Sequence, residues 1–318
     1  MLLWPSVVFI IGLIILVWSS DRFVDSAAAI AHNFGVPHIL IGVTIVSLGT
    51  SAPEILVSIN AALSDSVNLA MGNALGSNIA NIGLVLAVTA FIVPLPITRR
   101  VMRIENGILL LVTLAAGWVL SDYFLSIFDG LFLLTGMVIF LVWMFYDIKK
   151  SDTPEFEDSI PVSRPNGPAL IWFVISLLLL IASARAMVWG AMEIARSFNI
   201  SELVIGATIL ALGTSLPELA ASVTSALKKH HDIAIGNIIG SNIFNILAVM
   251  AVPGLINPSA LFHEVFWRDY MFVLGLTLLL SFTLFTLGRS GKPIGRVFAS
   301  IVGTLYIGYL YINYLELV

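Results

Sequence analysis

The sequence predicts an all-α integral membrane protein of ten transmembrane helices, arranged as two five-helix repeats of opposite orientation. Three observations carry this prediction. Hydrophobic residues make up 59% of the 318-residue chain and charged residues only 11%, against about 25% charged residues in soluble domains. Apolar runs of about 20 residues, enough to cross ~30 Å of hydrocarbon, recur along the whole length. Residues 42–82 and 206–246 align without a gap at an offset of 164, with 21 identical positions.

Ten apolar segments are long enough to span the bilayer. They cover residues 3–20, 37–63, 68–93, 104–121, 125–147, 168–190, 201–227, 232–256, 268–287 and 294–314. We expect the first and sixth to continue as tilted helices toward Asn33 and Phe198. The reason is that Ser26–Ala31 and Met187–Ile194 contain no helix breaker.

Basic residues predict the orientation of these spans. If the N-terminus faces outward, twelve Lys and Arg residues fall on the inner side and three on the outer side, a strong positive-inside bias. The inner set is Arg22, Arg99, Arg100, Arg103, Lys149, Lys150, Arg164, Lys228, Lys229, Arg289, Lys292 and Arg296, and the outer set is Arg185, Arg196 and Arg268. Both termini are therefore predicted to lie outside a cell (inner) membrane.

An odd number of spans, five, precedes the second copy, so the second half enters the membrane upside down relative to the first. We divide the chain into a first repeat (1–147), a cytoplasmic loop (148–167) and a second repeat (168–318). Glu105 and Asp269 extend the match, since they also differ by 164. Each of these two residues starts a span, so we expect its carboxylate to be exposed to water at the membrane interface.

Each copy places a glutamate inside an apolar span, Glu54 in G-T-S-A-P-E and Glu218 in G-T-S-L-P-E. A carboxylate at that depth is costly and is by default a functional-site hypothesis. Pro53 lacks an N–H, so the carbonyl of Gly49 loses its helical partner and the helix should unwind or kink near Gly49–Ser51. Pro217 has the same effect in the second copy.

The spacing of these residues favours a cation site. Thr50 and Glu54 are four residues apart and share a helix face, so a backbone carbonyl and a carboxylate can reach one point. Thr214 and Glu218 supply the same set. The two carboxylates and two carbonyls offer six oxygens, and Ca²⁺ takes 6–8. Their two charges would balance either one Ca²⁺ or two Na⁺. No His or Cys lies near the motifs, which disfavours a transition metal.

A second motif, G-N-x-x-G-S-N-I-x-N-I, follows each glutamate at residues 72–82 and 236–246. Its glycines have small-xxx-small spacing, which predicts close helix packing. Asn and Ser side chains recur at i, i+4 and i+8 and form neutral stripes suited to Na⁺: Asn73, Ser77 and Asn81, and Asn237, Ser241 and Asn245. Ser51 and Ser215 add hydroxyls beside the unwound turns. Interhelical hydrogen bonding and ion ligation are equal alternatives for Asn73, Asn78, Asn237 and Asn242.

At these motifs the chain resembles the sodium/calcium exchanger superfamily (cation/calcium exchangers), in its prokaryotic branch. The paired motifs look like that family's two alpha-repeats, and the similarity is strongest in residues 39–82 and 203–246. The resemblance implies a ten-helix sodium/calcium exchanger fold and secondary antiport of Na⁺ against Ca²⁺ by alternating access. It also implies that the long first and sixth helices slide across the core.

The resemblance assigns roles to named residues. Ca²⁺ would be bound by Thr50, Glu54, Thr214 and Glu218. Na⁺ would be bound by Ser51, Ser77, Asn81, Ala211, Ser215, Ser241 and Asn245. Asn245 stands where many relatives carry Asp, which implies transport independent of potassium. The family's 3:1 ratio implies electrogenic exchange.

Other functions stay open as alternatives. The nearest is antiport of H⁺ against Ca²⁺, or another divalent cation, through the same two glutamates, although the proton/calcium branch usually carries G-N-x-x-E instead. A channel is disfavoured because two carboxylates should hold Ca²⁺ too tightly for fast conduction. An enzyme is disfavoured because the sequence has no H-E-x-x-H. We expect Ca²⁺ and Na⁺ as substrates in a lipid bilayer, no cofactor and no nucleic-acid partner. The oligomeric state stays open, with a monomer among the options.

Overall fold

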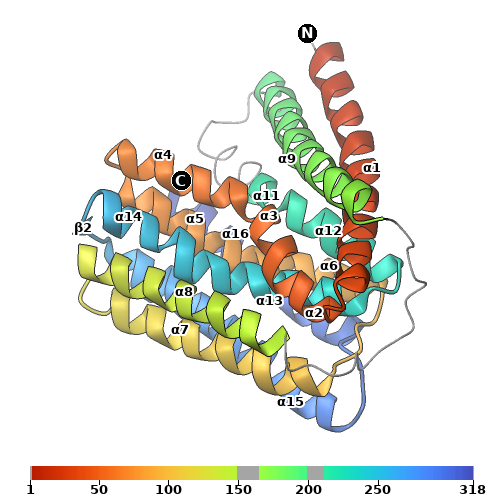
Figure 1. Cartoon of the computed structure of the whole chain (residues 1–318). Helices are drawn as coiled ribbons and strands as arrows, with labels where there is room; N and C mark the ends of the chain where they lie inside the picture. Colours follow the sequence, from red (N-terminus) through yellow and green to blue (C-terminus); the bar gives the residue numbers. More distant parts are fainter. Residues whose placement is uncertain (1, 149–164, 199–210, 318) are drawn as a thin grey trace.

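The computed structural model describes residues 2–148, 165–198 and 211–317. Most of the predicted loop 148–167 and the first ten residues of the predicted span 201–227 lie outside the described residues. The described part of the chain is helical except for turns, links and a short antiparallel pair in which β1 (Phe124–Leu125) meets β2 (Ser259–Ala260). Figure 1 shows the helices gathered into one bundle with a crossing pair at one side.

The helical elements of the first half include three π-helices, labelled η. In chain order they are α1 (Leu3–Asn33), α2 (His38–Ile41), η1 (Gly42–Val46), α3 (Ser47–Thr50), α4 (Ala52–Leu63), α5 (Val67–Ala80), η2 (Asn81–Leu86), α6 (Ala87–Ile92), η3 (Val101–Glu105), α7 (Asn106–Leu120) and α8 (Ile127–Ile148).

The second half repeats much of this pattern. Its described elements are α9 (Asn166–Ser197), α11 (Ala211–Thr214), α12 (Leu216–Leu227), α13 (His231–Phe244), η5 (Asn245–Val249), α14 (Ala251–Ile256), η6 (Val265–Tyr270), α15 (Met271–Arg289) and α16 (Arg296–Leu317).

Length and hydropathy make this a multi-pass membrane protein. Among the described residues, eight helices are long and apolar enough to cross a bilayer, or nine if the bent pair His38–Thr50 and Ala52–Leu63 is one span. The tenth predicted span, 201–227, is described only from Ala211 onward. The described residues therefore establish a polytopic helical protein without fixing the count at ten.

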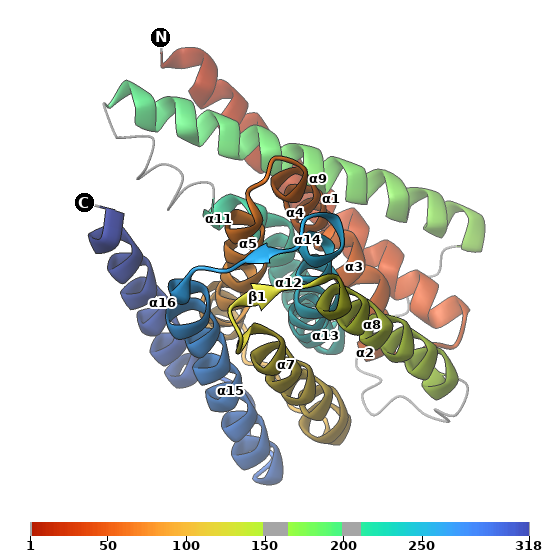
Figure 2. The ribbon, with the colours of Figure 1, turned by 90° about the vertical axis from the view of Figure 1, so that its left-hand side faces the viewer.

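The first and sixth predicted spans are long continuous helices, as the missing breakers predicted. α1 has 31 residues and α9 has 32, and they end at Asn33 and Ser197. They pack antiparallel, because Gly190 of α9 lies against Pro5 and Phe9 of α1. Figures 1 and 2 show this pair crossing one side of the bundle, over the helices that carry the motifs.

The centre of the bundle is formed by the two continuous segments that contain the second motif, 67–92 and 231–256. They are the most deeply buried of the candidate spans. At Gly236 and Gly240 an added Cβ would lie only 2.7 Å and 2.5 Å from the carbonyl oxygens of Ile39 and Val43. The predicted close packing is thus confirmed for the second repeat. A Cβ added at Gly72 or Gly76 of the first repeat would have no described atom within 4 Å, and the residues equivalent to Ile39 and Val43 lie outside the described part of the chain.

The expectation of interface exposure for Glu105 and Asp269 was wrong. Their side chains are only 1% and 3% exposed. The structure neutralises each charge with a nearby arginine instead: Arg100 lies 2.7 Å from Glu105, and Arg268 lies 2.8 Å from Asp269. A buried carboxylate in an apolar setting needs such a partner.

Candidate cation site

Two matched helix breaks position the glutamates. The chain leaves helical geometry for one residue at Ser51 (φ −83°, ψ 5°) and at Ser215 (φ −88°, ψ 5°). The helix axis bends by 43° at the first break. Each break precedes a proline near the start of the next helix, so the unwinding predicted for this turn is confirmed and falls at its last residue.

Glu54 and Glu218 occupy the first turns of α4 and α12. Both side chains are 1% exposed. The positive ends of the two helix dipoles favour a negative charge at these positions. One oxygen of each carboxylate, Oε2, has no hydrogen-bond partner among the residues that the structure describes. Each glutamate therefore presents a free, water-shielded oxygen.

The two repeats meet at these carboxylates. The hydroxyl of Ser51, in the first repeat, donates a hydrogen bond of 3.3 Å to Oε1 of Glu218, in the second. Ser51 lies three residues before Glu54, at the start of the Glu54 helix, so this bond joins the two glutamate turns. Two like charges held together in an apolar interior require a cation or protons to balance them.

Two asparagines, at equivalent positions of the two repeats, hold the glutamate turns in place. The amide of Asn73 donates to the backbone carbonyl of Glu54 at 3.1 Å. The amide of Asn237 donates to the backbone carbonyl of Glu218 at 3.4 Å. Both amides therefore act as hydrogen-bond donors to the glutamate turns.

The two asparagines differ in their further contacts. Asn237 also donates to Ser222 Oγ at 2.9 Å and accepts a bond of 3.1 Å from the hydroxyl of Thr50. Asn237 is fully buried, and Asn73 is partly exposed. Asn237 thus forms hydrogen bonds both within the second repeat and across to the first.

The last asparagine of each motif begins a π-helix. Asn81 starts η2 and Asn245 starts η5, at the same 164-residue offset. η2 packs against α12, and η5 packs against α4. Each π-helix therefore lies beside the glutamate helix of the other repeat. π-helical turns within α-helices are frequently found at functional sites.

Most of the buried polar atoms without partners belong to the repeated motifs. Within the described ranges the unpaired atoms here belong to Glu54, Asn78, Asn81, Ser215, Glu218, Ser241, Asn242 and Asn245. Native proteins pair nearly all buried polar groups. These donors and acceptors, most of them oxygens, form a chemically suitable shell for hard cations.

Most of the site residues predicted from the sequence are buried in the structure, but not all of them. The predicted residues that are buried are Thr50, Ser51, Glu54, Ser77, Asn81, Ser215, Glu218, Ser241 and Asn245. Thr214 is half-buried, and Ala211 is the first residue of α11, with its side chain outside the described set. The sequence-based site list omitted Asn78 and Asn242, although both carry unpaired buried atoms. Their place inside the repeated G-S-N-I motif was the signal for including them.

Comparison with known proteins places the chain among ion transporters. The family described as "Sodium/calcium exchanger protein" matches residues 4–146 and 168–315. CaxA of Alkalimonas amylolytica is 43% identical over 98% of this chain and 99% of its own length. The inner membrane protein YrbG of Escherichia coli is 40% identical over 92% of this chain and 91% of its own length. A structure of the sodium-calcium exchanger NCX_Mj, soaked with Na⁺ and Sr²⁺, superposes with a TM-score of 0.82 at 33% identity. That match covers 96% of this chain and 97% of the other.

Proposed function

The chain belongs to the sodium/calcium exchanger family, and on that premise we propose that it is a secondary-active antiporter that exchanges Na⁺ for Ca²⁺ by alternating access. The observation that carries the proposal is the hydrogen bond from Ser51 to Glu218 across the two repeats, beside a second glutamate with a free oxygen. A site shared between two halves can change its access when the halves move, without losing its ligands.

Ca²⁺ binds between the carboxylates of Glu54 and Glu218 and the backbone carbonyls of Thr50 and Thr214. The breaks at Ser51 and Ser215 support this assignment, because a helix interrupted by proline frees carbonyls for a ligand. Two carboxylates neutralise one Ca²⁺. The described residues contain no group of three or more His, Cys, Asp or Glu side chains that could hold a metal ion, so the proposed site has two acidic ligands.

Na⁺ binds to the neutral oxygens around the same carboxylates. The proposed ligands are Ser51, Ser77, Asn81, Ala211, Ser215, Ser241 and Asn245. Unpaired buried atoms on Asn81, Ser215, Ser241 and Asn245 support this choice. With three Na⁺ exchanged for one Ca²⁺, each cycle moves one net charge, so transport is electrogenic, and the neutral Asn245 fits independence from potassium.

The chain forms ten spans in two inverted repeats, 1–147 and 168–318, joined by a cytoplasmic loop at 148–167. Both termini face outward from the inner membrane. The matched helix breaks and the matched π-helices at the 164-residue offset support the inverted duplication, and the positive-inside bias supports the orientation.

Access changes when the antiparallel α1–α9 pair moves across the core. The pair packs on the motif helices through buried apolar side chains and at a few polar points. Lys228, at the end of α12, lies 2.6 Å from both Asp21 and Asp25 of α1. Ser20 of α1 shares a 2.8 Å hydrogen bond with Thr224 of α12. These polar contacts can exchange partners as the pair moves.

The test is ⁴⁵Ca²⁺ uptake into proteoliposomes loaded with Na⁺ or with choline, at equal pH on both sides. We expect uptake only with internal Na⁺, and loss of that uptake in Glu54→Gln and Glu218→Gln. Glu193→Gln is the matched control, since Glu193 is a partly exposed carboxylate paired with Arg196 on α9. Its uptake should equal that of the unmodified protein.

Other outcomes discriminate among the alternatives. Uptake that ignores Na⁺ and follows an imposed pH gradient would assign the glutamates to H⁺/Ca²⁺ exchange. Uptake that does not saturate and needs no counter-ion would indicate a channel. Normal Na⁺-driven uptake in Glu54→Gln or Glu218→Gln would refute the site while leaving the exchange activity intact.

A further inference from the structure

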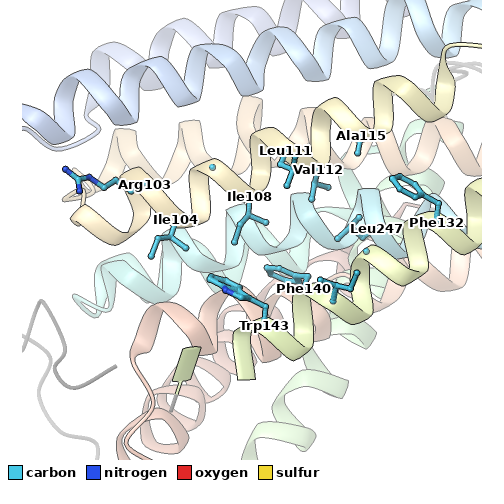
Figure 3. Close-up of a pocket in the computed structure, with 13 residues that line it drawn as sticks. Arg103, Ile104, Ile108, Leu111, Val112, Ala115, Phe132, Phe140, Trp143 and Leu247 are labelled. Carbon is cyan, nitrogen blue, oxygen red and sulfur yellow. The ribbon is translucent and has the colours of Figure 1, made fainter. Parts of the chain in front are cut away.

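An apolar groove on the outside of the bundle is not used by the proposed transport cycle. It has a volume of about 640 Å³ and runs between α8 and the continuous segment formed by η3 and α7. We call it the α7–α8 groove. Its walls include Ile104, Ile108, Leu111, Phe132, Phe140 and Trp143. Figure 3 shows Arg103 at one end of this row of side chains and Phe132 near the other.

Glycines keep the groove open. Gly107 and Gly136 both line it. A Cβ added at Gly107 would have no atom within 4 Å, so a larger side chain there would occupy the groove without displacing the described protein. At the matching position of the other repeat, 164 residues on, the chain has the partly buried Met271. The glycine that opens the groove therefore has no counterpart at the equivalent position of the second repeat.

The open end of the groove carries a positive charge. Arg103 is exposed and makes no ion pair with any residue that the structure describes, whereas its neighbour Arg100 is paired with Glu105 and Asp147. Arg99 lies on the same side of the membrane. Trp143 lines the groove toward this end (Figure 3), and tryptophan favours the level of lipid headgroups.

The length of the groove matches one leaflet. From Arg103 to Ala115 the helix advances twelve residues, about 18 Å at the helical rise of 1.5 Å per residue. Half of a hydrocarbon core of ~30 Å is about 15 Å. A charged end at the membrane surface and an apolar groove one leaflet deep match the headgroup and the acyl chain of a single phospholipid.

We propose that the α7–α8 groove is a binding site for one anionic glycerophospholipid, with its phosphate on Arg103 and one acyl chain along Ile108 and Leu111. The floor of the groove is Leu247, in η5, two residues from Asn245. The acyl chain therefore packs against the back of the π-helix that begins with Asn245. Lipid binding itself does not depend on which ions the protein exchanges.

The test is native mass spectrometry of the purified full-length protein titrated with phosphatidylglycerol or phosphatidylcholine. We expect one phosphatidylglycerol to be retained in preference to phosphatidylcholine. Arg103→Gln should weaken its binding about fivefold, the effect of one basic side chain near an anionic lipid surface. Gly107→Met, which copies the other repeat, should abolish that first site. Gly275→Met is the control, because Gly275 is an exposed helical glycine of α15 with no neighbour within 4 Å.

A second measurement keeps the proposal testable if Gly107→Met does not fold. Phosphatidylglycerol with brominated acyl chains should quench the fluorescence of Trp143, seen as the difference between the unmodified protein and Trp143→Phe. The proposal is overturned if that difference is absent, or if Gly107→Met binds the lipid normally. It is also overturned if both lipids bind equally and Arg103→Gln has no effect. A dimer that Gly107→Met dissociates would show instead that a second copy of the chain covers the groove.

Discussion

Replacing Asn237 by alanine should destabilise the protein more than the same replacement of Asn73. The two residues occupy the same position in the two repeats, and the residues around them are largely identical. Sequence symmetry alone would predict equal effects. The structure predicts unequal ones, because the two amides have different numbers of partners.

The expected difference follows from the hydrogen bonds. Among the described residues, Asn237 takes part in three, with Glu218, Ser222 and Thr50, whereas Asn73 makes one, to the carbonyl of Glu54. A net contribution of about 1 kcal/mol per bond gives a difference of about 2 kcal/mol in the free energy of unfolding. For a chain of this size, about 2 °C per kcal/mol corresponds to a gap of roughly 4 °C in melting temperature.

Thermal unfolding of both purified variants in detergent, without Na⁺ or Ca²⁺, measures this gap. The ions are left out because a ligand that binds only the folded state would shift the melting temperature by itself. The reasoning would be refuted if the two variants melted at the same temperature, or if Asn73→Ala melted lower. Either result would mean that the bonds of Asn237 add nothing to the core.

Three further predictions concern packing, pH and voltage. Gly240→Ala should lower the free energy of unfolding by about 1–3 kcal/mol, because its Cβ would lie 2.5 Å from the carbonyl of Val43; in the same melting assay, Gly275→Ala should have no such effect. Burial lowers the pKa of His230, in the turn before α13, from 6.5 to about 4, with a smaller contribution from nearby His38. The unfolded chain therefore takes up this proton first, so stability is full above pH 6.5 and falls as the pH drops toward 4. A His230→Gln variant should show a flatter profile in denaturant titrations across this range. Finally, an inside-positive diffusion potential should accelerate Ca²⁺ uptake into Na⁺-loaded vesicles, with ~2.3 kcal/mol available per charge per 100 mV, and no response would indicate electroneutral exchange.

The features that sequence reasoning predicted well are those that depend on one residue type at one place. Pro53 cannot donate a backbone hydrogen bond, so a break just before it follows from covalent chemistry. The absence of breakers likewise predicted that α1 and α9 would be long. The repeat of Glu54 as Glu218 inside apolar segments indicated a buried site, and both side chains are buried.

The features that could not be predicted depend on which atoms meet across the bundle. Nothing in the two identical asparagine positions distinguishes Asn237, with three partners, from Asn73, with one. The π-helices at Asn81 and Asn245 have no local composition signal, because backbone geometry there is set by packing between the repeats. The burial of Glu105 was missed because its partner Arg100 lies just outside the predicted span, where its side chain was expected to reach water.

The Ser51–Glu218 hydrogen bond has an evolutionary consequence. If the chain arose by gene duplication, the ancestor was a single unit of five helices, and this contact was then made between two separate molecules. Such a unit held only one motif glutamate, so a two-carboxylate site required a pair of subunits, inserted into the same membrane in opposite directions under the proposed topology. Because η2 and η5 begin at equivalent asparagines, the π-helical turn belonged to that ancestor before fusion, and the present single chain preserves the arrangement of an ancient dimer.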